Sequence, residues 1–351
     1  TSLSTITLER RSKMIKDSSD TIILGIETSC DETSAAVVKN GREVLSNIIS
    51  SQIEIHQRFG GVVPEIASRN HTMAIVNVID QALKQADIVL DDIDAVAVTY
   101  GAGLVGALLV GVSAAKALSY MLNKPLIAVN HIRAHIAANY LESDLEPPFL
   151  GAVVSGGHTE LVDIKDYTHY EILGSTLDDA AGEAFDKVAR VLGLGYPGGP
   201  KIDKLAKEGK HSIEFFKTAK MISDEYAFSY SGLKTAVVNY IHNAKQRGEE
   251  INIPDICASF TYYALEPIVQ KAFDAAKKLG YQNIALAGGV AANSYLRQRF
   301  KEMGTKHGIK VYIPKLEYCT DNAAMVASMG YYNYINNVGI SDLTLNAVPS
   351  L

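Results

Sequence analysis

Short apolar runs alternate with longer helical patterns along most of the chain, and this alternation predicts an α/β fold. Residues 22–39, IILGIETSCDETSAAVVK, have the pattern of a strand, a small polar turn around Asp31 and a second strand. Residues 94–122 continue as a strand, a glycine turn and a helix, and residues 124–141 as a strand and a helix. We therefore expect a sheet with helices packed against it.

The same order of elements starts again after Pro147-Pro148, a proline pair that stiffens a connection. Residues 149–164 repeat the strand, polar turn and strand, and residues 283–300 give a strand, Gly-Gly and a helix. We predict two duplicated α/β domains, at 22–148 and 149–345, with the last helix able to pack back on the first domain. Residues 1–21 are expected to be a leader or a disordered tail.

Residues 177–200 have the clearest helical pattern. Apolar residues recur at helical spacing from Ala181 to Leu192, and two glycines follow. We expect Asp178 and Asp179 in the first turn of this helix. Residues 196–200, YPGGP, are expected to form a stiff loop that lies flat against a ribose or a base.

Composition narrows the class of protein. The chain has 351 residues, 47% of them hydrophobic and 21% charged, and we find no apolar run long enough to span a bilayer. Three cysteines without CxxC spacing argue against a disulfide framework and favour a reducing compartment.

The net charge of the chain does not identify its binding partner. The net charge of −6 gives no general attraction to nucleic acid, so any RNA must meet a local basic patch or a partner protein. Residues 297–310 are the best candidate for a phosphate-contacting surface, with a solvated helix face as the alternative. The first twenty residues hold Ser, Thr and the pair Arg10-Arg11, which fits the remnant of a mitochondrial leader.

Glycine turns at the ends of predicted strands are candidate phosphate sites, because their backbone donors are not covered by side chains. Two such turns contain Gly156-Gly157 and Gly288-Gly289, and we expect a nucleotide cleft between the halves. Asp186 and Asp203 can accept ribose hydroxyls. Asn293 can bond ribose or base, although a solvated charge is the alternative for each single acid.

His131 and His135 are four residues apart, so on a helix both imidazoles can reach one metal ion. The pair lacks the glutamate of the HExxH zinc proteases, and a structural role is the alternative. Asp321, where a loop enters a predicted helix, is the best third ligand, with Asp31 and Glu32 as other candidates. Two histidines and one carboxylate suit zinc or iron(II).

Nine segments of the chain match the motifs of one known family. They are GIETSCDET, GGVVPEIASRNH, GAGLVGALLVG, HIRAH, VSGGHTEL, DDAAGEAFDKVARVLGLGYPGGP, FSYSGLKTA, AGGVAANSYLR and CTDNAAM. With them the chain resembles, over about residues 22–330, the TsaD-type tRNA N6-adenosine threonylcarbamoyltransferases, once called O-sialoglycoprotein endopeptidases. Two departures are Ala102, where many members have proline, and Asn130, where bacterial members often have a second histidine.

The resemblance implies an actin-like, sugar-kinase-like fold and one divalent metal per subunit, either zinc or iron, with magnesium as a further option. It places the metal on His131, His135 and Asp321. Contacts to threonylcarbamoyl-AMP or an adenine nucleotide carry over to Val153, Val154, Ser155, Gly156, Gly157, Asp186, Gly199, Asn293 and Asp203. With the N-terminal residues, the resemblance favours the mitochondrial member and a location in the matrix.

The implied reaction transfers threonylcarbamoyl from its adenylate to the exocyclic amine of the adenine 3′ of the anticodon, in tRNAs that read codons starting with A. Asp31 or Glu32 is the candidate base. A separate synthase would supply the adenylate, and a homodimer would pool basic patches. The alternatives are an ATP-dependent kinase or ATPase, a metalloprotease and a non-catalytic nucleotide-binding subunit.

Overall fold

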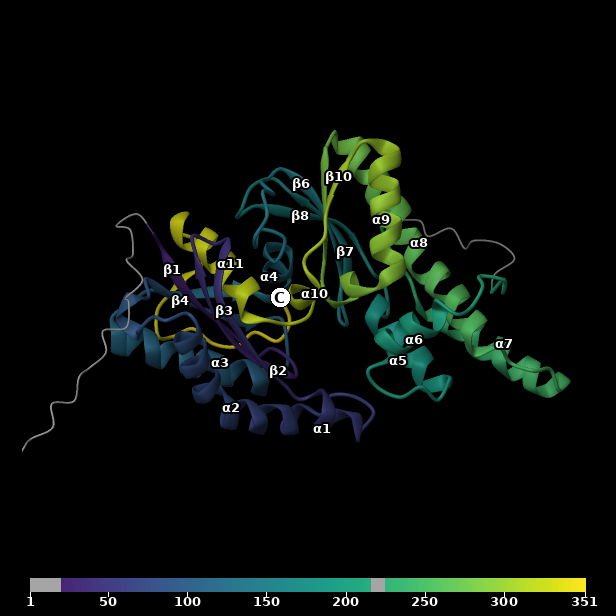
Figure 1. Cartoon of the computed structure of the whole chain (residues 1–351), viewed down its shortest axis with the longest axis horizontal. Helices are drawn as coiled ribbons and strands as arrows, with labels where there is room; N and C mark the ends of the chain where they lie inside the picture. The colour runs from purple at the N-terminus through teal and green to yellow at the C-terminus, as the bar shows by residue number, and fades with distance from the viewer. Residues whose placement is uncertain (1–19, 216–224) are drawn as a thin grey trace, which may run out of the picture.

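The computed structural model describes residues 20–215 and 225–351 and has two lobes, each built on one sheet (Figure 1). The first sheet has the strand order β11-β5-β4-β1-β2-β3. Its strands are β1 (Ile22–Glu27), β2 (Glu32–Lys39), β3 (Glu43–Ser51), β4 (Ala95–Gly101), β5 (Leu126–Asn130) and β11 (Ile340–Ser341). The second, in the order β10-β9-β6-β7-β8, contains β6 (Phe149–Val154), β7 (Thr159–Ile164), β8 (Tyr170–Ser175), β9 (Asn283–Ala287) and β10 (Lys310–Tyr312).

The two sheets repeat one topology. In each, three successive strands pair antiparallel, β1-β2-β3 and β6-β7-β8. The first strand of each set then pairs in parallel with a later strand, β4 or β9, which pairs in turn with β5 or β10. The predicted duplication is therefore present as repeated strand order.

Helices cover both sheets. In the first half they are α1 (Ile53–Gln57), α2 (Pro64–Gln85), η1 (Leu90–Asp92), α3 (Val105–Leu122) and α4 (His131–Ala137). In the second they are α5 (Ala181–Val191), α6 (Gly198–Ala206), α7 (Ser231–Arg247), α8 (Ile253–Leu279), η2 (Gly289–Ala292), α9 (Ser294–His307), α10 (Leu316–Cys319) and α11 (Ala323–Ile335). By sheet membership, the chain leaves the first lobe after α4 and returns to it at α11 and β11.

Helices α4 and α11 join the lobes. One buried cluster contains residues of both helices together with Ile23 of the first sheet and Val153 and Ala285 of the second. Helix α11 approaches β1 so closely that a Cβ on Gly25 would lie 2.3 Å from the Ala323 carbonyl oxygen. The start of α11 is thus held in place by close packing.

Two local predictions are wrong. Helix α5 begins at Ala181, so Asp178 and Asp179 lie before its first turn; Asp178 instead accepts hydrogen bonds from the backbone of Tyr230 and Ser231, at the start of α7. The expected loop at 196–200 turns into α6 at Gly198. The first-turn amides of a helix need no intrahelical acceptor, so a proline at position 200 is tolerated there.

Within the described part of the chain, one helix is apolar and long enough to cross a bilayer by length and composition alone. This helix is α3, with a mean hydropathy of 1.6 over 18 residues, so the expectation of no such run is also wrong. One face of α3 is buried, because α3 packs against β4 and α2. The helix is therefore part of the first lobe's core.

Candidate metal and nucleotide site

Two histidines and one carboxylate converge between the lobes. The Nε2 atoms of His131 and His135 lie 3.5 Å and 3.2 Å from Oδ1 of Asp321. One nitrogen or oxygen from each of the three side chains lies within 4.8 Å of the others. The structure thus brings Asp321 to the two predicted histidines, which lie nearly two hundred residues earlier in the sequence.

The local sequence explains why these side chains point the same way. Strand β5 runs directly into α4, and the Asn130 side chain caps that helix by accepting hydrogen bonds from the amides of Ile132 and Arg133. Asn322 caps α11 in the same manner, through the amide of Met325. The departure at Asn130 therefore positions the helix that carries both histidines.

Glu27 contacts the ring nitrogen of His131 that does not face Asp321. This fully buried carboxylate lies 3.3 Å from Nδ1 of His131, and it accepts hydrogen bonds from Thr99 Oγ1 at 2.6 Å and from the Ser29 amide at 2.5 Å. A carboxylate at Nδ1 favours the tautomer with a proton there, which leaves Nε2 free for a ligand.

The ionisable side chains of the cluster shift one another's pKa values. Burial would lower the pKa of His131, but the Asp321 and Glu27 carboxylates raise it to about 9. Burial would raise the pKa of Asp321, but the two histidines lower it to about 2. Two imidazole nitrogens and an ionised carboxylate are a ligand set that suits zinc or iron(II), so the residues fit the metal.

A cavity of about 440 Å³ comes within one residue of the cluster along the chain. It is lined by Gly156, Asp186, Gly199, Asp203 and Asn293, which are five of the predicted contacts, and also by Ile53 of the first lobe. Thr320, the neighbour of Asp321, lines it too. We refer to this cavity as the nucleotide pocket.

Three polar residues of the nucleotide pocket are held in place by the backbone around them. Asp186 accepts a hydrogen bond from the Gly198 amide at 2.7 Å, and burial raises the pKa of its carboxyl. Asp203 accepts from the amide and hydroxyl of Ser294. Asn293 caps α9 with its carbonyl oxygen, so its amide nitrogen offers a donor to a ligand.

Four other predicted contacts do not line this pocket. Val153 and Val154 are fully buried in β6, and their side chains belong to the two hydrophobic clusters on either side of the second sheet. Ser155 is also buried, and its hydroxyl accepts a hydrogen bond from the His158 amide. Gly157 is exposed, and a Cβ there would meet nothing within 4 Å.

Asp31 and Glu32 form a buried acidic pair at the start of β2. Burial, followed by the charges of Asp31 and Asp321, raises the pKa of Glu32 to about 9, so Glu32 is protonated at neutral pH. Among the described residues, Oδ2 of Asp31 has no hydrogen-bond partner although it is buried. Because Glu32 is protonated and hydrogen-bonds to Asp31, Asp31 is the candidate base of the two.

Sequence reasoning gave no role to Glu27 or to the side chain of His158, and it included Tyr196 only as part of the loop at 196–200. Burial and the nearby charges of His131 and His135 lower the pKa of His158, which places a neutral imidazole beside the cluster. Tyr196 lines the nucleotide pocket, and burial together with Asp31 and Asp186 raises the pKa of its phenol. His158 lies within the predicted glycine turn and Tyr196 within the expected loop, so their positions in these segments were the available signals.

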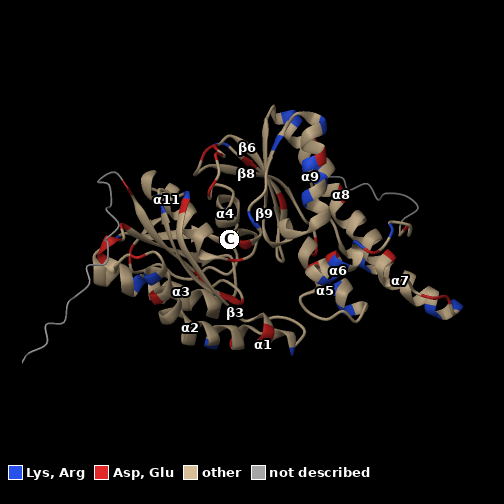
Figure 2. Ribbon diagram, in the orientation of Figure 1, with Lys and Arg blue, Asp and Glu red and all other residues tan. Residues whose placement is uncertain are grey.

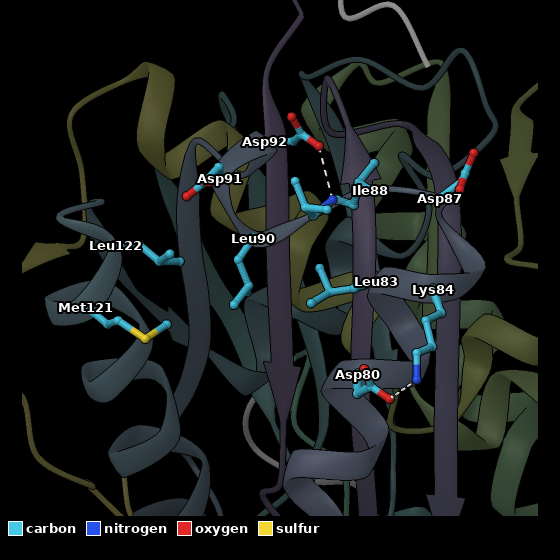
Figure 3. A pocket seen from close by; sticks show the side chains of 11 residues that line it. Asp80, Leu83, Lys84, Asp87, Ile88, Leu90, Asp91, Asp92, Met121 and Leu122 are labelled. Carbon is cyan, nitrogen blue, oxygen red and sulfur yellow. Dashed lines mark hydrogen bonds and ion pairs between the residues drawn. The ribbon is translucent and has the colours of Figure 1, made fainter. Parts of the chain in front are cut away.

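A larger cavity, of about 830 Å³, lies elsewhere, between η1 and the C-terminal ends of α2 and α3 (Figure 3). Its polar lining is mainly acidic, and its single lysine, Lys84, is paired with Asp80 at 2.6 Å. It contains none of the predicted site residues. An acidic cavity of this kind repels phosphate, so the candidate site is the smaller pocket beside the metal cluster.

Solved structures define the class of the fold. HypF from T. kodakarensis superposes with a TM-score of 0.63 at 16% identity, over 93% of this chain and 49% of that one. Component A of the (R)-2-hydroxyglutaryl-CoA dehydratase of Acidaminococcus fermentans gives a TM-score of 0.51 at 15% identity, over 90% and 99% of the two chains. The predicted actin-like, sugar-kinase-like class is confirmed.

Sequence comparison gives the family. A family model described as "TsaD: tRNA N6-adenosine threonylcarbamoyltransferase" matches residues 43–328, and the chain belongs to this family. A relative of that name from Clostridioides difficile (strain 630) is 58% identical, over 95% of this chain and 98% of its own. One from Clostridium beijerinckii is 56% identical, over 94% and 97%.

Proposed function

We propose that the protein transfers a threonylcarbamoyl group from threonylcarbamoyl-AMP to the exocyclic amine of the adenine 3′ of the anticodon, in tRNAs that read codons starting with A. Family membership supports the reaction. The structural observation that carries the proposal is that Thr320, the residue before Asp321 of the metal cluster, lines the nucleotide pocket. We place the adenylate of the donor in the pocket and its carbamoyl end toward the cluster.

The pocket residues orient the donor. Gly156 offers its backbone to the phosphate, Asp186 accepts from the ribose, and Asn293 donates to the ribose or the base. In the reaction the adenine nitrogen forms a bond to the carbamoyl carbon, and the bond from that carbon to the phosphate oxygen breaks. The nitrogen loses one proton, which Asp31 accepts, and AMP leaves.

His131, His135 and Asp321 are the proposed ligands of one divalent cation, zinc or iron(II). When bound, such a cation supplies Lewis-acid polarisation of the carbamoyl carbonyl. The chain's own contribution is to hold two Nε2 atoms and one carboxylate oxygen in fixed directions, through Glu27 and the capped helices α4 and α11.

The reaction is tested directly by mass spectrometry. Purified protein is incubated with a threonylcarbamoyl-adenylate generator and unmodified tRNA, and the tRNA is digested to nucleosides. We expect threonylcarbamoyladenosine to form only with protein, generator and tRNA together. Rapid ATP hydrolysis without tRNA, and no modified nucleoside, would support an ATPase instead.

The proposal includes two protein partners. One is a separate synthase, which we propose makes the adenylate from threonine, bicarbonate and ATP. A homodimer is proposed through α2 and α3, which lie side by side and expose the large apolar side chains of Met73, Val76 and Val105. Light scattering should give twice the chain mass, and Val76→Glu should give the monomer.

A mitochondrial location stays a prediction that rests on residues 1–21, of which residues 1–19 lie outside the described part of the chain. The relatives compared here are bacterial and lend it no support. Import of the full chain, but not of residues 22–351, into isolated mitochondria would support it.

A further inference from the structure

A third cavity, of about 230 Å³, lies beside the nucleotide pocket. Asp203 and Lys207 line both, and the other walls of the third cavity include His211, Tyr262 and Tyr295. Sites for drug-sized ligands are usually ~300–1,000 Å³, so this cavity suits one ring system better than a second nucleotide.

Two stacked aromatic rings line this cavity. The rings of His211 and Tyr262 lie face to face, with centroids 3.8 Å apart and planes inclined by 22°. Tyr263 meets His211 edge-on at 5.5 Å and supports it. His211 is exposed, and burial lowers the pKa of its imidazole, so at neutral pH an uncharged ring is presented to a planar partner.

Lysines recur beside this stack. Along α6 and the turn after it they stand at every third position, as Lys201, Lys204, Lys207 and Lys210. Lys201 is bound to backbone carbonyls, and Lys207 pairs with Asp203 at 3.3 Å. Lys204 is exposed and lines the nucleotide pocket. Lys210 is exposed as well. Figure 2 shows the blue positions of α6 in the second lobe, well away from the acid-rich end of α2 and α3.

We propose that α6 and the His211–Tyr262 stack form the surface on which the RNA substrate docks, with the lysines on its phosphates and an unpaired loop base on the stack. The inference rests on the proposed function and deepens it. Proteins that recognise single-stranded RNA combine aromatic platforms with cationic grooves. Because the cavity lined by this stack shares Asp203 and Lys207 with the nucleotide pocket, a base held on the stack leaves its neighbour in the loop near the donor.

Stacking is tested by anisotropy titration of a labelled anticodon stem-loop into the full chain. His211→Ala and Tyr262→Ala should raise the Kd by about 5- to 100-fold, the range that corresponds to loss of one base–aromatic stack. Tyr262→Phe should keep wild-type affinity, because the ring is retained. A Kd for either alanine variant within twofold of wild type would overturn the base-stacking site.

The phosphate contacts are tested by the salt dependence of the same Kd. Lys204→Gln and Lys210→Gln should each reduce the slope of log Kd against log salt concentration by about 0.7. Lys301→Gln and Lys306→Gln, exposed lysines on α9, are the matched controls and should leave the slope unchanged. If only the α9 variants change the slope, RNA docks on α9 and the proposal is wrong.

A nucleoside assay separates this inference from the proposed function. If the wild type modifies tRNA but the His211 and Tyr262 variants bind RNA normally, only the docking surface is wrong. If the wild type neither binds the stem-loop nor modifies tRNA, the function itself fails. AMP affinity should be the same in His211→Ala as in the wild type, which shows that the variant retains its fold.

Discussion

At the scale of single residues, the site depends on Glu27 as much as on the three proposed ligands. Its carboxylate is fully buried, and it can remain ionised there because His131 faces it. Burial raises the pKa of Glu27, but the charge and hydrogen bond of His131 outweigh that effect and lower it. A buried carboxylate held this way fixes both the orientation and the tautomer of its histidine.

Replacement of Glu27 by Gln should therefore weaken metal binding. We expect a loss of about 10- to 100-fold in zinc affinity, the usual cost of removing a partner of a ligating histidine. Competition with a chromophoric chelator measures it. Asp163→Asn, which removes another buried carboxylate and leaves His131 untouched, is the control and should bind zinc like the wild type.

Metal affinity should also depend on pH. With a pKa of about 9, His131 is protonated in the metal-free protein at neutral pH, and it must lose that proton to bind a cation. Apparent zinc affinity should thus rise with pH, by about tenfold per unit between pH 6 and 8, and level off above pH 9. An affinity that is flat from pH 6 to 9 would contradict the assigned charge state.

At the scale of elements, the start of α11 positions Asp321. The helix is buried between the sheets, and its first residues press on β1 at Gly25. The sequence analysis allows the last helix to pack back on the first domain, and α11 contacts β1, β2 and β4 of the first sheet. The close contact with Gly25 is what ties the carboxylate to the lobe that carries the histidines.

Gly25→Ala should destabilise the protein by about 1–3 kcal/mol, because the new Cβ would overlap the backbone of Ala323 and Ala327. Gly232→Ala, where a Cβ meets nothing within 4 Å, should change the free energy of unfolding by less than about 1 kcal/mol. Chemical denaturation measures both. Equal stability of the two variants would mean that α11 can move away from β1 at little cost.

At the scale of the whole molecule, the amino-acid pattern predicts the two lobes and the duplication well. Apolar runs bounded by turns mark most strands, because each strand is buried by its own lobe. Contacts that bridge distant segments were predicted less well. The Glu27–His131 contact joins residues 104 positions apart, and local periodicity carries no information about such pairs.

The residues of the candidate site were also predicted unevenly from the sequence. His131, His135 and Asp321 were found through spacing, resemblance and helix starts, and the glycine turns through their position after strands. Val153 and Val154 were carried over from a motif whose flanking positions are buried strand. The loop at 196–200 was assigned to a turn because prolines and glycines signal turns, although such residues also occur at the first positions of helices.

The central claim is that three converging side chains hold the cation that the transfer requires. The most direct measurement takes the His131→Ala/His135→Ala double variant and the wild type, determines bound metal, and assays threonylcarbamoyladenosine in the same samples. We predict a folded variant with no bound metal and no modified nucleoside, beside wild type with about one metal per chain and full modification. Full transfer by the metal-free variant would contradict the claim.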